Sequence, residues 1–224
     1  ALAGKLRSRY PDAMIIEIDW SEAMLTSART EDTRVCADSH RLPLADASID
    51  LIVSNLMLPG CEAPETVFAE ARRVLRNPGL FLFSTLGPDT LKEVRRAWSR
   101  IDAKPHVHSF ADMHNIGDAL VKAGFREPVM DVEKLTITYA EINKLVSDLR
   151  AVAATNIASD RCRGLTTPRH WARFVSELNT VRNPAGRLPV TLEVVTGQAW
   201  TGNPDIGVPL EDGEAHFPLS QLKY

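Results

Sequence analysis

Acidic and amide side chains stand at points of this 224-residue chain where short apolar runs end. Asp19 closes the run "MIIEID", Asp38 and Ser39 follow "TRVCA", and Asn55 follows "IDLIVS". Such runs predict buried strands of a parallel sheet, and ligands bind outside the carboxyl ends of these strands. One acid can accept two vicinal hydroxyls, and a second acid beside an amide can bind a purine edge. For each residue alone, a helix cap or a turn remains an open alternative.

The elements that would position these residues alternate between strand and helix along the first two thirds of the chain. Strands are predicted at about 14–19, 33–37, 50–54 and 80–85, and helices at about 21–29, 63–75, 87–101 and 112–123. We further expect a strand within "EPVMDVEKLTITYA", helices at about 140–153 and 168–179, and a last strand at 188–200. This alternation favours an α/β fold with a mainly parallel sheet and helices on both faces.

The segments around the strand ends resemble class I S-adenosylmethionine-dependent methyltransferases, through "IDWSEAML", "LPLADASIDLIVSNL" and "FAEARRVLRNPGLFLFST". Later segments, "GPDTLKEVRRAW", "PHVHSF", "DLRAVAATN" and "GRLPVTLEVVTG", resemble the malonyl-acyl carrier protein O-methyltransferases of biotin synthesis. The same segments are also similar to a methyltransferase-like assembly factor of respiratory complex I. The resemblance covers roughly residues 1–200 and implies a Rossmann-like fold with a seven-stranded, mainly parallel sheet.

The resemblance implies that S-adenosylmethionine is the cofactor, with Asp19 on the ribose hydroxyls and Asp38 with Ser39 on the adenine edge. The remaining cofactor-binding residues are expected to be Trp20, Met24, Asn55 and Leu56. The family's glycine-rich loop is missing from the sequence, and we expect its place to be just before Ala1. That loop passes close to the cofactor, which only glycine allows.

The implied methyl acceptor is a malonyl carboxylate, on acyl carrier protein or on coenzyme A. A carboxyl group with an ordinary pKa of about 4 is ionised at pH 7, so no catalytic base is expected. Arg150 would hold the carboxylate or thioester, unless it simply faces solvent. His106 and Phe110 would shape a substrate wall or pack a loop. The histidine spacing in "HVHSFADMH" matches no standard zinc pattern, so no metal is expected.

The domain organisation follows from the same elements. We expect a cofactor-binding core over residues 1–139, whose first strand would lie upstream, and a helical lid or substrate subdomain over residues 140–185. The final sheet strand would lie at 186–200, and residues 201–224 would form a loosely held extension. The two lid helices would cover the cofactor cleft.

Composition limits the cellular compartment and the binding partners that we expect. A net charge of −3 argues against general nucleic-acid binding, and no window approaches the length of a membrane span. Three widely spaced cysteines fit a reducing cytoplasm. An acidic carrier protein would be steered by basic residues. Two groups are candidates, Arg95, Arg96, Arg100 and Lys104 as one and Arg161, Arg163, Arg169 and Arg173 as the preferred one.

Two other classes of protein remain as alternatives. A nicotinamide-dependent dehydrogenase would share an acid after the second strand, but it does not account for "LPLADASIDLIVSNL". An assembly factor or scaffold would keep the fold and bind a protein partner instead of catalysing a reaction. An intact glycine-rich loop would favour the enzyme, and a degenerate loop would favour the scaffold.

Overall fold

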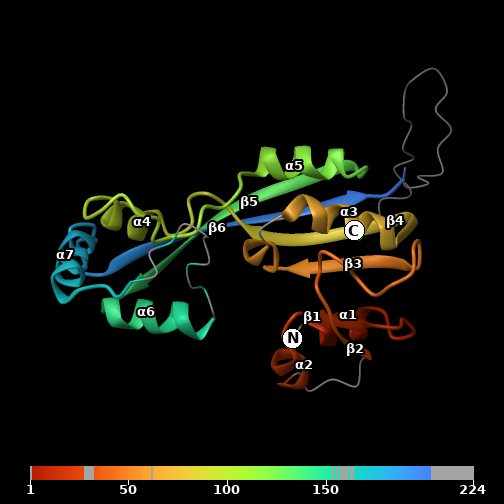
Figure 1. Ribbon diagram of the computed structural model, residues 1–224, viewed down its shortest axis with the longest axis horizontal. Helices are drawn as coiled ribbons and strands as arrows, with labels where there is room; N and C mark the ends of the chain where they lie inside the picture. The colour runs from red at the N-terminus through yellow and green to blue at the C-terminus, as the bar shows by residue number, and fades with distance from the viewer. Residues whose placement is uncertain are drawn as a thin grey trace.

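The structure is a computed structural model that describes residues 2–27, 33–61, 63–152, 154, 156, 161 and 164–202. Its strands are β1 (Ile16–Asp19), β2 (Thr33–Cys36), β3 (Ile49–Asn55), β4 (Leu75–Leu86), β5 (Arg126–Tyr139) and β6 (Leu188–Trp200). Its α-helices are α1 (Leu2–Arg9), α2 (Glu22–Ser27), α3 (Pro64–Val74), α4 (Lys92–Ser99), α5 (Met113–Lys122), α6 (Ile142–Ala151) and α7 (Pro168–Asn179), and η1 (Leu58–Gly60) is a 3₁₀ turn (Figure 1).

The strands form two sheets within the described residues. β1 and β2 pair in parallel, while the larger sheet has the order β3-β4-β6-β5. β3, β4 and β5 run in one direction there, and β6 runs antiparallel to both of its neighbours, β4 and β5. The expected alternation of strands and helices is present, and the larger sheet is mixed among the described residues because one of its strands is reversed. This last strand inserts between β4 and β5 from the opposite direction, a long-range pairing that periodicity does not reveal.

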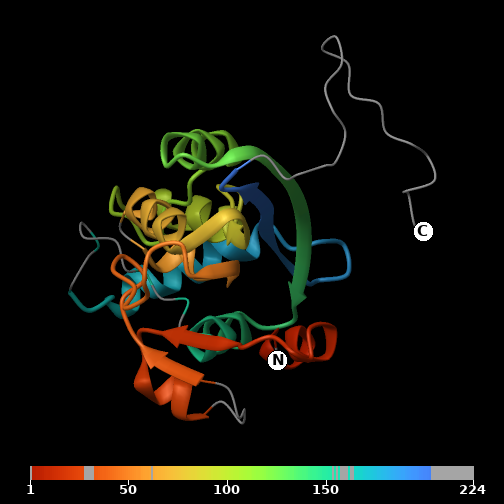
Figure 2. The ribbon, with the colours of Figure 1, turned by 90° about the vertical axis from the view of Figure 1, so that its right-hand side faces the viewer.

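The two sheets lie apart from one another. Both views place α1, α2 and the β1–β2 pair on the opposite side of β3 from α5 (Figures 1 and 2). The chain enters the larger sheet only at β3.

One apolar core lies between the larger sheet and helices α3 and α5. Phe81 and Phe83 share one face of β4 because side chains alternate along a strand, and their ring centroids are 5.3 Å apart. Phe68 of α3 packs against both rings, at centroid distances of 6.0 and 6.2 Å. Leu120 of α5 and Phe125 complete this core, and both are almost fully buried.

A second core joins α4, α6 and α7. Trp98 of α4 stacks on Phe174 of α7 with ring centroids 4.5 Å apart, and Leu145 of α6 is buried beside them. The helices pack on the start of β6, where Leu188 and Val190 are buried. Figure 1 shows these three helices gathered at one end of the molecule, around the outer parts of β5 and β6.

The strand register places this second core relative to the site. Leu86, the last residue of β4, pairs with Val194 of β6. The part of β6 from 188 to 193 therefore extends beyond the carboxyl end of β4, still paired with β5. Helices α6 and α7, which pack on this extension, lie on the carboxyl-end side of β3 and β4.

Local residues account for several helix ends. Asp112 caps α5 by accepting a hydrogen bond from the backbone N–H of Asn115 at 2.8 Å, and Pro168 opens α7. Gly124 follows α5 with a φ of 89°, the left-handed conformation that glycine adopts readily.

Two boundaries differ from the expected ones. β4 begins at Leu75, so "RNPG" lies inside the strand, where the β3–β4 register shifts and leaves the proline without a ladder partner. Thr201 is buried rather than loosely held, and its hydroxyl donates to the carbonyl of Arg76 and accepts from the N–H of Gly79. Residues 203–224, the remainder of the expected extension, lie outside the described residues.

Candidate functional site

Short contacts join the carboxyl ends of β1 and β2 and link the segment after β2 to the segment after η1. The N–H of Ala37 donates to the carbonyl of Asp19 at 3.1 Å, which joins the ends of β1 and β2. Beyond β2, the hydroxyl of Ser39 lies 3.9 Å from the thiol of Cys61, in the segment that follows η1. The structure therefore joins the ends of β1 and β2 and brings the segment after β2 to the segment after η1.

Asp19 is exposed and takes part in a local turn. One carboxylate oxygen accepts from the backbone N–H of Ser21 at 2.7 Å. Ser21 in turn caps α2, because its hydroxyl accepts from the N–H of Met24 at 3.4 Å. The turn role that was left open is thus real. It uses only one oxygen, and the other has no partner among the described residues, so it can accept from a ligand.

Asp38 repeats this geometry at the end of β2. Its Oδ1 accepts from the backbone N–H of His40 at 2.9 Å and from the ring Nδ1 at 2.7 Å. These two bonds, the backbone bond first, hold the pKa of the Asp38 carboxyl below its usual range. Asp38 is therefore ionised at neutral pH and can act only as an acceptor. Its Oδ2 has no partner within the described part of the chain.

Asn55 and Leu56 are held by one residue of the neighbouring strand. The hydroxyl of Ser84 donates to the side-chain oxygen of Asn55 at 2.7 Å. The N–H of Leu56 donates to the carbonyl of Ser84 at 3.0 Å and approaches its hydroxyl at 3.1 Å. Leu56 has a φ of 53° and a half-exposed side chain. A leucine in this left-handed region costs about 1–3 kcal/mol, a strain that occurs often at functional sites.

Large apolar side chains surround these polar groups without being buried. The side chain of Trp20 is 76% exposed and that of Met24 is 62% exposed, whereas the neighbouring Leu25 is buried. The exposed aromatic and thioether groups follow Asp19 directly in the chain, so they can pack on a planar base while the free carboxylate oxygen of Asp19 accepts from a sugar hydroxyl.

Sequence reasoning missed the residues that support this site. His40 and Ser84 orient the predicted site residues but were not singled out. His40 lies two residues beyond Asp38, a spacing at which an aspartate commonly bonds its own backbone, so a local signal existed. Ser84 is 29 residues from Asn55, and only the pairing of β3 with β4 brings the two together.

The expected substrate residues lie on α6 and in the loop between α4 and α5. His106 stacks on Trp98 at 3.8 Å between ring centroids, and its Nε2 donates to Asp102 at 2.9 Å. Phe110 meets the ring of His108 edge-on. Arg150 is exposed near the end of α6, with no side-chain partner among the described residues. His106 thus packs against the second core, which agrees with the packing alternative.

Two classes of feature are absent from the described residues. No three histidine, cysteine, aspartate or glutamate side chains in this part of the chain gather as a metal site would. No helix among these residues is long and apolar enough to span a membrane.

Cys36 and Cys61 are free thiols, and burial raises the pKa of Cys61. Cys162 lies outside the described residues.

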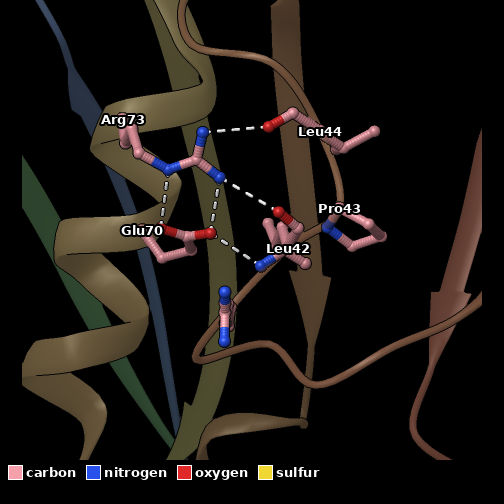
Figure 3. A pocket seen from close by; sticks show the side chains of 6 residues that line it. Leu42, Pro43, Leu44, Glu70 and Arg73 are labelled. Carbon is pink, nitrogen blue, oxygen red and sulfur yellow. Dashed lines mark hydrogen bonds and ion pairs between the residues drawn. The ribbon is translucent and has the colours of Figure 1, made fainter.

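A cavity of about 580 Å³ lies between the 41–44 segment and α3 (Figure 3). Arg73 crosses it, donating to both oxygens of Glu70 and to the carbonyls of Leu42 and Leu44. Glu70 also accepts from the N–H of Leu42 at 2.6 Å. These groups satisfy one another's hydrogen bonds, and Arg73 and Glu70 thereby hold the loop after β2 against α3. We therefore do not read the cavity as a second ligand site.

Comparison with known proteins supports a methyltransferase fold. A family model described as "Methyltransferase domain" matches residues 1–83. A crystal structure of a methyltransferase from Bacillus halodurans superimposes with a TM-score of 0.59, covering 84% of this chain and 83% of that one. Only 14% of the aligned residues are identical, so this likeness concerns the fold.

Two curated relatives are much more similar in sequence. The malonyl-[acyl-carrier protein] O-methyltransferase of Laribacter hongkongensis is 45% identical over 212 residues, which cover 88% of this chain and 71% of the relative. The enzyme of the same name from Gallionella capsiferriformans is 42% identical, over 96% of this chain and 77% of its own.

The fold, the family model and these relatives together identify the chain as an S-adenosylmethionine-dependent methyltransferase of class I. Within that class, the chain belongs to the family of malonyl-[acyl-carrier protein] O-methyltransferases.

Proposed function

We propose that this protein methylates the free carboxylate of a malonyl group carried by acyl carrier protein, the step implied by the resemblance to biotin-synthesis enzymes. The observation that carries the proposal is the 45% identity with a relative of that name over most of the chain. The acids at the strand ends, Asp19 exposed and Asp38 half-buried, would supply the cofactor-binding chemistry that the reaction needs.

The residues at the strand ends would bind the adenosyl part of the cofactor. Asp19 would accept from the ribose hydroxyls through its free oxygen, and Asp38 with Ser39 would contact the adenine edge. Apolar contacts to the base would come from Trp20, Met24 and Leu56, with Asn55 beside them. When bound, S-adenosylmethionine supplies a sulfonium methyl group. The chain needs no base, because the acceptor carboxylate is already ionised at pH 7.

Helices α6 and α7 would then form a lid that carries the substrate contacts. Their support is the strand register, which places them on the carboxyl-end side of β3 and β4. Arg150, exposed on α6, would hold the acyl carboxylate or thioester by a charge-assisted hydrogen bond. The chain's contribution to the rate would be orientation of the acceptor and exclusion of water.

A seventh strand would complete the sheet between β1 and β3. Among the described residues β1 bonds only to β2, and β3 bonds only to β4, so each has one unpaired edge. Unpaired edges leave backbone groups unsatisfied and are usually covered. One parallel strand between them would merge the two sheets and would bring its following loop beside Asp19.

The reaction is tested by radiolabelled methyl transfer to malonyl-acyl carrier protein and to malonyl-coenzyme A. We expect transfer by the parent protein and a loss of about ten- to a hundredfold in turnover for Arg150→Ala, because a hydrogen bond to a charged group contributes about 1.5–3 kcal/mol. Cofactor affinity should stay unchanged in this variant. Lys144→Ala, also exposed on α6, is the matched control.

The outcomes distinguish the proposed methyl transfer from the proposed role of Arg150. No transfer to either acceptor, by protein that binds S-adenosylhomocysteine in calorimetry, would favour an assembly factor that keeps the fold. Normal turnover in Arg150→Ala would remove only the role of that residue.

A further inference from the structure

Two groups of basic residues that are far apart in sequence lie on one surface of the structure. Helices α4 and α7 are separated by about seventy residues of chain but pack side by side at one end of the molecule (Figure 1). Their apolar sides meet through Trp98 and Phe174, with Val94 and Leu178 buried alongside. The sides with charged residues are therefore turned outward.

The outward sides carry four arginines, Arg96 and Arg100 on or just after α4 and Arg169 and Arg173 on α7, which we call the arginine face. All four are exposed. The guanidinium of Arg173 approaches the carbonyl of Arg100 at 3.5 Å, so the two helices contribute to one continuous surface.

Few acids offset this charge. Arg100 forms an ion pair with Glu177 at 2.8 Å. Asp102, nearby, is hydrogen-bonded to His106 in the second core. The side chains of Arg96 and Arg169 have no partner among the described residues. Because the whole chain has a net charge of −3, this concentration of positive charge is local.

Not every arginine of the two groups belongs to this face. Arg95 points back into the molecule, where it donates to the carbonyls of Pro88 at 2.8 Å and Thr90 at 3.1 Å. It therefore stabilises the turn between β4 and α4. Arg163 lies outside the described residues.

We propose that the arginine face docks the acidic surface of the acyl carrier protein, an inference that rests on the proposed function. Charge complementarity favours an acidic protein, and the location favours one that delivers a substrate. Helix α4 begins just after the carboxyl end of β4, and α7 packs beside it, so both lie on the side of the sheet where the strand-end acids are. A carrier held there has its acyl arm on the same side as the cofactor residues.

The experiment compares two acceptors that differ only in the carrier. Methyl transfer is measured with malonyl-acyl carrier protein and with malonyl-pantetheine, for the parent, Arg96→Glu, Arg169→Glu and the double variant. Lys122→Glu, an equal charge reversal on the exposed end of α5, is the matched control. Neither arginine is buried or paired, so the variants should fold as the parent does.

The double variant should lose about tenfold or more in kcat/KM with the carrier protein, the lower end of what electrostatic steering contributes. Its activity with malonyl-pantetheine should be unchanged, and Lys122→Glu should match the parent with both acceptors. Raising salt to roughly 0.5 M should shrink the difference, because exposed charges are screened.

Other results would overturn the docking proposal. Unchanged carrier kinetics in the double variant would show that the face does not dock the carrier. Duplex DNA binding that the variants lose, with carrier kinetics unchanged, would assign the face to nucleic acid. An equal loss with both acceptors would place the arginines in the acceptor site instead. Inactivity of the parent with both acceptors would contradict the proposed function itself, and direct carrier binding by calorimetry would then decide the docking question separately.

Discussion

At the scale of residues, the same hydrogen-bonded aspartate turn occurs twice in the candidate site. Asp19 and Asp38 each use one oxygen to accept from the backbone N–H two residues later. The turn orients the carboxylate and leaves the second oxygen outward, so one residue both shapes the loop and offers an acceptor. Structural and functional roles are therefore not exclusive at these positions.

Asp19→Asn should weaken binding of S-adenosylhomocysteine by about ten- to a hundredfold, since a hydrogen bond to a charged acceptor is worth about 1.5–3 kcal/mol. Asparagine keeps an oxygen for the N–H of Ser21, so the turn should persist. Calorimetric titration measures the effect, with Asp12→Asn, an exposed acid outside the site, as the control. Unaltered affinity in Asp19→Asn would remove the residue from the cofactor site.

His40→Ala should raise the pKa of Asp38 part of the way toward its usual value. The substitution removes the ring bond but keeps the backbone N–H, which is the larger cause of the lowered pKa. A lowered folded-state pKa contributes stability above the unfolded value of about 3.9, and this contribution is lost as pH falls through the folded pKa. Carboxyl-carbon NMR titration reads the pKa, with His114→Ala as control. An unchanged pKa would show that the ring bond does not form.

At the scale of elements, the second core decides where the proposed lid lies. Trp98 is stacked between the rings of His106 and Phe174, which joins α4, α7 and the loop after α4. Leu188 and Val190 anchor the same helices to β6. The position of α6 and α7 thus depends on few large side chains.

Trp98→Ala should lower the free energy of unfolding by about 3–5 kcal/mol, because a large buried side chain leaves a cavity that collapses only partly. Urea denaturation measures the loss, and Trp98→Phe should restore part of it. Trp20→Ala, whose side chain is 76% exposed, should change stability by no more than about 0.5 kcal/mol yet weaken cofactor binding. Similar destabilisation by both tryptophan substitutions would contradict this division of roles.

At the scale of the whole molecule, the division into two sheets is the feature with the clearest consequence. Among the described residues, neither β1 nor β2 pairs with a strand of the larger sheet. A strand that joined the sheets would fix the distance between Asp19 and Asn55.

In a chain that carries the proposed joining strand, the outward N–H groups of β1 and β3 should exchange with solvent slowly, because each would be bonded in a ladder. In residues 1–224 alone the same groups should exchange fast, and cofactor binding should be weaker. Hydrogen exchange read by NMR gives both values. Equal exchange in the two chains would contradict a strand at this place.

Local chemistry made several strand ends and helix ends predictable from the sequence. Asp19, Asp38 and Asn55 could be found because strand ends are marked by apolar runs, and the ends of α5 and α7 because Asp112 and Pro168 act within one turn of chain. Neighbours in the chain suffice for such features. Ser84 beside Asn55, the antiparallel insertion of β6, the packing of His106 and the joining of Arg96 with Arg169 needed the tertiary structure. The contacts of Ser84, of β6 and of the two arginines join residues about 30 to 120 positions apart. His106 is close to Trp98 in sequence, but the loop conformation that stacks the two rings is not contained in the periodicity of one segment. The sequence by itself determined which groups could act as acceptors, and only folding decided which of them meet.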